Sequence, residues 1–124
     1  MNFLAVALGG AVGSMARYGV QTLFRIWFGS TLPWGTLFVN LLGCFIIGAC
    51  AVLLEHGWPW LRPWVMTGVL GGFTTFSAFS LESGYLIRNG QPLAFIINVL
   101  VSVVGGILLT FAGYASMRSL MGGP

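Results

Sequence analysis

Four long apolar segments constrain this chain most, because each is long enough to cross a lipid bilayer as a helix. Crossing about 30 Å of hydrocarbon takes roughly 20 helical residues. The four segments cover roughly residues 3–28, 35–54, 63–87 and 93–117. Three of them open on a proline, whose missing N–H costs nothing at a helix start: Pro33, Pro63 and Pro92. The sequence therefore predicts an all-α membrane protein, with residues 1–124 forming one domain of four spans.

Charged side chains are too scarce to cover a surface that faces water. They make up 6% of the 124 residues, whereas 57% are hydrophobic, and a soluble domain carries about a quarter charged residues. The net charge of +3 comes from five scattered arginines rather than a basic patch. This composition excludes a soluble enzyme, a disordered chain and a nucleic-acid-binding protein. Apolar runs of this length also exclude a β-barrel, which needs short alternating strands.

The arginines that flank the spans do not favour one orientation in the membrane. With four spans, one side carries Arg62 and Arg118 and the other carries Arg25 and Arg88. Because Arg and Lys in short loops set orientation, this equal count leaves it open. Either other features decide the orientation, or copies insert both ways and pair as an antiparallel homodimer.

Several polar side chains fall inside the spans, where each needs a partner or a role. Asn40 shares one small-residue face with Thr36, and its amide has two N–H donors to satisfy. Arg17 lies too deep to reach the interface easily, so it faces water, an anion or an ion-pair partner such as Glu82. The fourth span carries a stripe that either joins packed helices or lines a polar path: Asn98, Ser102, Gly106 and Thr110.

The third span predicts a helix that is broken midway across the membrane. Paired glycines, Gly71 and Gly72, weaken a helix, and the adjacent threonine hydroxyls compete for backbone carbonyls. Backbone freed at that depth is tolerated where it lines a cavity or binds an ion such as Na⁺. Beyond the break, Phe76 and Phe79 share one helix face, which is typical of core packing and equally compatible with a pore lining.

Residues that could support catalysis or transition-metal binding are missing. The chain has no Asp and one His, and Cys44 and Cys50 lie about 9 Å apart along one helix, too far for a disulfide. A proton-coupled small multidrug exporter needs an acid in the first span, but the first acid is Glu55. A non-transporting assembly protein explains the glycines but not Asn40 or the phenylalanine pair.

Three motifs in order resemble those of the Fluc (CrcB-type) fluoride channels. GGAVGSMARY at residues 9–18 resembles the opening motif, GTLFVNLLG at 35–43 the second-helix motif, and GGFTTFSAFS at 71–80 the third-helix signature. One departure is Ala78, where Thr or Ser is expected as often. The resemblance implies an antiparallel dual-topology homodimer with two pores in a bacterial inner membrane. Its activity is the passive exit of fluoride from the cytoplasm.

The resemblance also implies roles for individual residues. Asn40 is an amide donor beside the pore-lining Phe76 and Phe79, and Arg17 stands in an aqueous entrance. The backbone carbonyls of Gly71 and Thr74 from both copies hold a structural Na⁺. The remaining pore candidates are hydroxyl residues of the third and fourth spans and one acid toward the far end of the pore: Thr75, Ser77, Ser80, Ser102, Thr110 and Glu82.

This assignment agrees with the chemistry of fluoride, which is small and strongly hydrated. A pore must replace the lost water with donors, as a K⁺ filter replaces it with acceptors. Amide and hydroxyl groups are such donors, and aromatic ring edges carry positive quadrupole density. None of these groups is a full charge, so the ion is not held too tightly to leave.

Overall fold

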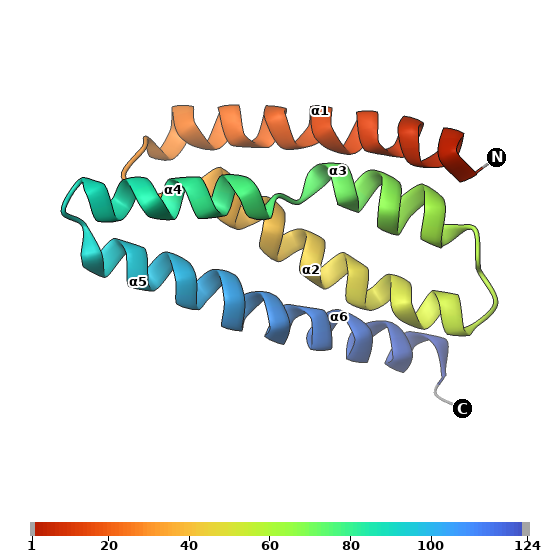
Figure 1. The fold of residues 1–124 in the computed structure, drawn as a ribbon. Coiled ribbons are helices and arrows are strands. Elements are labelled where there is room, and N and C mark those ends of the chain that lie inside the picture. The colour runs from red at the N-terminus through yellow and green to blue at the C-terminus, as the bar shows by residue number, and fades with distance from the viewer. Residues whose placement is uncertain (1, 123–124) are drawn as a thin grey trace.

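The computed structural model describes residues 2–122, and that part of the chain consists of helices joined by short connections (Figure 1). Four apolar rods are long enough to cross a membrane, at Asn2–Phe28, Trp34–Glu55, Arg62–Arg88 and Pro92–Met121. The prediction of an all-α chain with four spans is therefore confirmed. In chain order the elements are α1 (Asn2–Phe28), α2 (Trp34–Glu55), the π-helical η1 (Arg62–Leu70), α3 (Gly71–Phe73), α4 (Phe76–Arg88), α5 (Pro92–Leu100), the π-helical η2 (Val101–Gly105) and α6 (Gly106–Met121).

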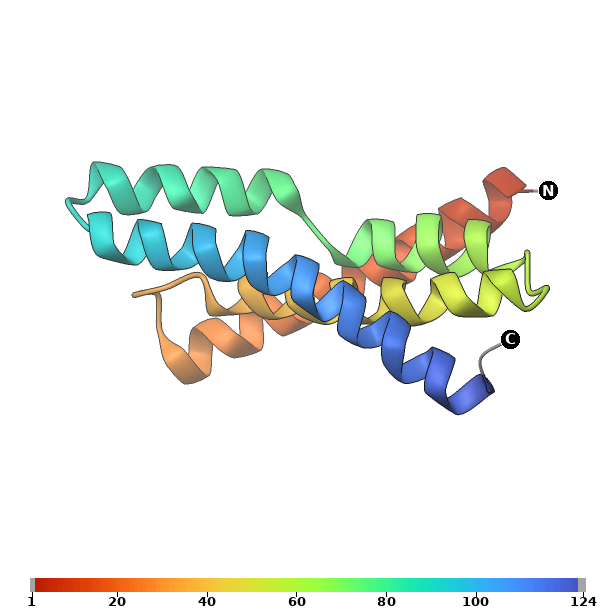
Figure 2. The same cartoon turned by 90° about the horizontal axis from the view of Figure 1, so that it is seen from below.

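The rods lie side by side along a common direction (Figures 1 and 2). Helix α1 packs along η1 and α3, α2 packs along α6, and α4 packs along α5. Helix α1 begins and α6 ends at the same end of the bundle as the loop between α2 and η1 (Figure 1). Arg62 and Arg118 therefore lie toward one end and Arg25 and Arg88 toward the other, as the equal count assumed.

Glycines allow the closest of these helix contacts. A Cβ atom built on Gly48 of α2 would overlap the backbone of α6 at Thr110, and one on Gly113 would overlap the backbone of α2 at Phe45. Gly13 of α1 faces the carbonyl of Val69 in the same way. Without Cβ atoms the backbones approach closely, which is the usual basis of helix association inside membranes. The interpretation of the first-span glycines as packing residues is confirmed.

The third rod is two helical stretches joined by two extended residues. Helix α3 ends at Phe73, Thr74 follows at φ −86°, ψ 156° and Thr75 at φ −153°, ψ 112°, and α4 begins at Phe76. The Ala78 N–H donates to Thr75 Oγ1 at 3.2 Å, which caps the new helix. Helix α4 then leaves the direction of α3 and runs beside α5 (Figure 2). The fourth rod, by contrast, keeps helical backbone through both of its junctions.

Candidate functional site

The Asn40 side chain is hydrogen-bonded to the interruption between α3 and α4. Its Nδ2 donates to the Thr75 carbonyl at 3.0 Å, and its Oδ1 accepts from the Thr75 N–H at 2.7 Å. One amide thus satisfies both backbone groups of a residue that has left the helical ladder. The sequence predicted that this amide needs partners, and the structure supplies them from a segment 35 residues away. One N–H of Nδ2 remains for another acceptor.

This pairing also changes the surroundings of two backbone carbonyls. In a continuous helix the Thr75 N–H would donate to the Gly71 carbonyl, and the Ala78 N–H would donate to the Thr74 carbonyl. Here those N–H groups donate to Asn40 Oδ1 and Thr75 Oγ1 instead. The carbonyl oxygens of Gly71 and Thr74 are therefore released from their usual helical donors. These are the two carbonyls expected at the sodium site.

An apolar cavity of about 300 Å³ borders the interruption. Two phenylalanine rings of α4 lie at its edge with centroids 5.4 Å apart and planes tilted by 51°. Phe79 is 8% exposed, whereas Phe76 is 77% exposed, so this chain covers little of the Phe76 side chain. The cavity brings together seven of the predicted site residues: Asn40, Gly71, Thr74, Thr75, Phe76, Phe79 and Ser102.

Ser102 is the only member of the fourth-span stripe on this cavity wall. It lies in η2, and its Oγ is buried without a hydrogen-bond partner among the described residues. Thr110 instead donates to the Gly106 carbonyl of its own helix at 3.1 Å. Asn98 is 2% exposed and donates from Nδ2 to Ser83 Oγ at 3.0 Å, which joins α5 to α4. Within one chain the stripe therefore divides: Ser102 lines the cavity, Asn98 joins two helices, and Thr110 bonds to its own helix.

The other predicted hydroxyls of α4 are not on the wall of this cavity. Ser77 and Ser80 are exposed, and Ser77 Oγ lies 3.3 Å from Thr75 Oγ1. Ser77 lies between Phe76 and Phe79 in the first turn of α4, and Ser80 directly follows Phe79. Their hydroxyls are therefore available to a neighbouring molecule rather than to the core of this chain.

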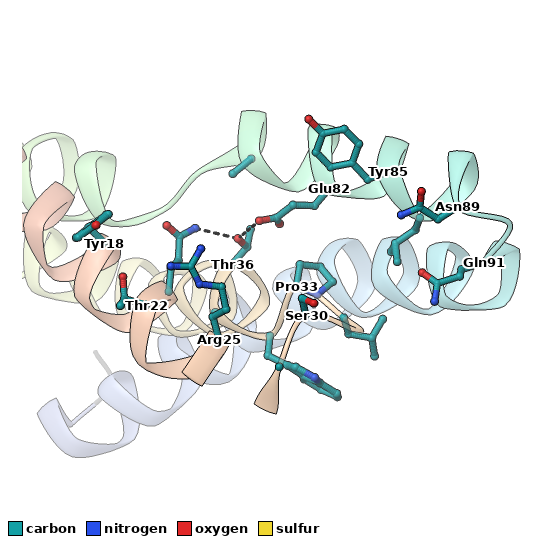
Figure 3. Close-up of a pocket in the computed structure, with 17 residues that line it drawn as sticks. Tyr18, Thr22, Arg25, Ser30, Pro33, Thr36, Glu82, Tyr85, Asn89 and Gln91 are labelled. Carbon is teal, nitrogen blue, oxygen red and sulfur yellow. Dashed lines mark hydrogen bonds between the residues drawn. The ribbon is translucent and has the colours of Figure 1, made fainter. Parts of the chain in front are cut away.

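Glu82 lies in a second, more polar cavity of about 570 Å³ between α1, the start of α2 and α4 (Figure 3). Its Oε1 accepts a hydrogen bond of 2.8 Å from the Thr36 hydroxyl, which in turn accepts one of 2.9 Å from Gln21 Nε2. Its Oε2 is buried and has no partner within residues 2–122. The ion pair with Arg17, one of the alternatives that the sequence left open, is not formed within residues 2–122 of one chain.

Two residues on this cavity wall, Gln21 and Arg25, were not predicted as site residues from the sequence. Gln21 stands one helical turn after Arg17 on α1, and this spacing was the available signal for it. Arg25 lines the cavity, whereas Arg17 is half-buried and lines neither cavity. In a single chain Arg17 therefore does not line the polar cavity, although the adjacent residue Tyr18 does.

Comparison with known proteins decides the family. The family described as CrcB-like protein, Camphor Resistance (CrcB), matches residues 4–114. This chain belongs to the CrcB-like family. Similar curated proteins share its full length. They are named Fluoride-specific ion channel FluC in Salinibacter ruber (44% identical; 100% of this chain, 95% of the relative), Paracoccus denitrificans (48%; 96% and 96%) and Aquifex aeolicus (45%; 94% and 96%).

In this CrcB-like chain the three motifs meet around the interruption. The first motif packs on η1 and α3 through Gly13, the second supplies Asn40, and the third contains the extended residues and both phenylalanines. Residues from the second and third motifs, which are far apart in the sequence, thus lie together beside the apolar cavity. In a multi-pass membrane protein, backbone that leaves the helix needs hydrogen-bond partners because the lipid supplies none. Here the Asn40 side chain supplies them for Thr75.

Proposed function

We propose that this protein is a fluoride-selective channel that lets fluoride leave the cytoplasm passively, down its electrochemical gradient. The observation that carries this proposal is the apolar cavity on which Asn40, the phenylalanine pair and Ser102 converge without a charged group. The names of its full-length relatives, each a fluoride-specific ion channel, support the same substrate. Among the mostly apolar residues of the wall are amide and hydroxyl donors and two aromatic rings, the kinds of group that a bare small anion requires.

The chemistry of transfer follows from these groups. Fluoride gives up water as it enters and is met by the free N–H of Asn40, the Ser102 hydroxyl and the edges of Phe76 and Phe79. Each contact is weak compared with an ammonium or guanidinium group, so the anion is stabilised without being trapped. Thr75, Ser77 and Ser80 add hydroxyls before, between and after the two rings at the start of α4.

The channel is proposed to be an antiparallel homodimer with two pores. Phe76 is 77% exposed in the single chain, and Ser77 and Ser80 are exposed beside it. A hydroxyl is poorly placed against lipid and well placed against a second copy. The equal division of arginines between the two ends supports insertion of copies in both orientations.

Insertion in both orientations has a direct measurement. A reporter fused after the last helix is expected to give signal from both sides of the membrane, because the flanking arginines balance. Adding two arginines to one end should collapse the signal to one side and abolish flux. Flux then returns when a copy carrying the extra arginines at the opposite end is co-expressed. A reporter signal from only one side for the unmodified protein contradicts dual topology.

A structural Na⁺ is proposed where the interrupted rods of two copies meet. The released carbonyls of Gly71 and Thr74 fit such an ion, because carbonyl oxygens are hard neutral ligands suited to a hard cation, and both residues border the open cavity. When bound, the ion supplies positive charge that holds carbonyl oxygens of both copies together. Association of the copies that is equally strong in Na⁺ and in N-methyl-D-glucamine would contradict this site.

The two alternative functions have less support. A four-span exporter that couples to protons needs an acid in the first span, and the two acids within residues 2–122 lie at the end of α2 and in α4. A non-transporting assembly protein leaves the Asn40 contacts and the exposed Phe76 without a role. Neither function matches the names of the relatives. The proposed location is the inner membrane of a bacterium.

Fluoride efflux from liposomes tests the proposal. Purified protein in liposomes loaded with fluoride is expected to release it when a potassium ionophore balances charge, and to retain chloride under the same conditions. Selectivity follows from the absence of a fixed charge on the cavity wall and from its small donors. A fluoride electrode and a chloride electrode make the measurement. No efflux, or chloride efflux as fast as that of fluoride, contradicts the channel.

A further inference from the structure

Three side chains from three helices form a hydrogen-bonded row with a fixed direction in the polar cavity (Figure 3). Gln21 Nε2 lies 2.9 Å from Thr36 Oγ1 and, as an amide nitrogen, can only donate to it. The Thr36 hydroxyl donates its single proton to Glu82 Oε1, 2.8 Å away. Thr36 is 3% exposed, so water does not compete for its hydroxyl.

This direction decides where Glu82 can carry a proton. Oε1 must accept from Thr36, so a proton on the neutral acid belongs to Oε2. Oε2 is buried and has no partner among the described residues. As a bare carboxylate oxygen it would be an uncompensated negative charge next to an anion path, which is costly. As an O–H it is a donor that still needs an acceptor.

We infer that Gln21 is a positioning residue, which orients the Thr36 hydroxyl so that neutral Glu82 presents an O–H donor at Oε2 to the passing anion. This inference rests on the proposed function and assigns the donor at the polar end of the path. It gives Gln21 a role that depends on its donor and not on its size.

The other titratable and charged groups that line the cavity around Glu82 come from α1 and α4. Helix α1 contributes Tyr18 and Arg25 to the cavity wall, and α4 contributes Tyr85. The residues that the start of α2 and the α4–α5 connection contribute are neutral. Arg25 is the one cation among the residues that line this cavity. It is exposed and points its guanidinium into the cavity (Figure 3), where it attracts an anion toward the row.

The experiment compares fluoride efflux for the unmodified protein, Gln21→Met and Gln21→Glu over a range of pH around neutrality. Methionine keeps the length of the side chain but cannot donate, so the Thr36 hydroxyl is free to turn and accept from Glu82. Efflux is expected to fall about tenfold, the loss of one hydrogen bond to an ionisable group. Glutamate accepts the Thr36 proton and leaves Glu82 Oε1 without a donor, so its efflux falls at least as far.

The pH profile separates this role from simple packing. Efflux of the unmodified protein should decrease as rising pH ionises Glu82 and removes the O–H donor, and Glu82→Gln should lose that dependence. Gln21→Met should flatten the profile, because its Glu82 no longer presents the proton at Oε2. The infrared carbonyl band of neutral Glu82 should also shift in Gln21→Met, since Oε1 loses its donor.

The matched control is Leu23→Met, which places the same new side chain on α1 at a residue that is 46% exposed and outside the cavity wall. It should keep both the rate and the pH profile. If the unmodified protein conducts fluoride and Gln21→Met keeps the same efflux rate, pH profile and carbonyl band, the role of Gln21 is contradicted while the proposed function stands. If Gln21→Met does not fold, an unchanged profile in Gln21→Glu contradicts that role equally. Absence of efflux from unmodified protein overturns the proposed function itself.

Discussion

Replacing Phe76 with isoleucine is expected to reduce fluoride efflux by about two orders of magnitude, or ~2.7 kcal/mol, while the protein still folds. Isoleucine fills much of the same space but has no ring quadrupole, so the positive edge that faces the anion is lost. Phe76 is 77% exposed in the single chain, so little of its packing depends on the ring. The liposome efflux assay measures the rate, and size-exclusion chromatography in detergent verifies that the variant folds.

The control for this variant is Phe3→Ile. Phe3 is 92% exposed at the start of α1, far from α4 in the sequence and in the bundle (Figure 1), and does not line either cavity. It makes the same chemical change on an equally free ring and should leave efflux unchanged. If Phe76→Ile conducts as fast as Phe3→Ile, the ring belongs to packing between copies and not to the anion path.

Phe79 serves as an internal comparison because its surroundings differ. It is 8% exposed, so Phe79→Ile removes core contacts as well as a ring edge. A buried Phe that is cut back costs stability through lost contacts and the cavity left behind. Loss of efflux in this variant is therefore less specific than in Phe76→Ile, although the two rings are 5.4 Å apart. The exposed ring is the more informative site.

The features that could be predicted from the sequence are those set within one helix. Span limits follow from apolar length and from prolines, and they agree with the helices to within a few residues. Phe76 and Phe79 were paired correctly because residues three apart share a helix face. The interruption was predicted from the glycine pair and the adjacent threonines; it lies at Thr74 and Thr75, whereas Gly71 and Gly72 stay helical in α3.

The contacts between helices could not be predicted, because no spacing rule relates residues on different rods. Asn40 was recognised as a polar group in need of partners, but its pairing with Thr75 depends on how α2 crosses the third rod. Gln21 was not recognised at all, because its role exists only through Thr36 and Glu82. The stripe on the fourth rod was predicted either to join packed helices or to line a polar path. Its periodicity is real, yet Asn98 and Thr110 each bond to a helix rather than to the apolar cavity.

A second large loss of fluoride efflux is expected for Asn40→Asp, which replaces the amide NH₂ group beside the interruption with an oxygen. Asp keeps an oxygen to accept from the Thr75 N–H, but it puts a second oxygen where Nδ2 donates to the Thr75 carbonyl at 3.0 Å. Two oxygens that cannot share a proton repel, and a buried polar group is left unsatisfied at a cost of about 1–3 kcal/mol. The extended geometry of Thr75 is lost with it, so α4 no longer starts at Phe76 in the right direction.

Efflux of Asn40→Asp should therefore be abolished near neutral pH and recover in part at acidic pH. A neutral aspartic acid has an O–H that can replace the lost N–H donor to the Thr75 carbonyl, whereas the carboxylate has none. Fluoride efflux and thermal unfolding in detergent, each measured against pH, give the two readings. Asn40→Leu is the matched control, because it lacks both the acceptor and the titratable donor and should stay inactive at every pH. Equal loss at all pH values in both variants would contradict the claim that an N–H or O–H donor at residue 40 to the Thr75 carbonyl is what restores efflux.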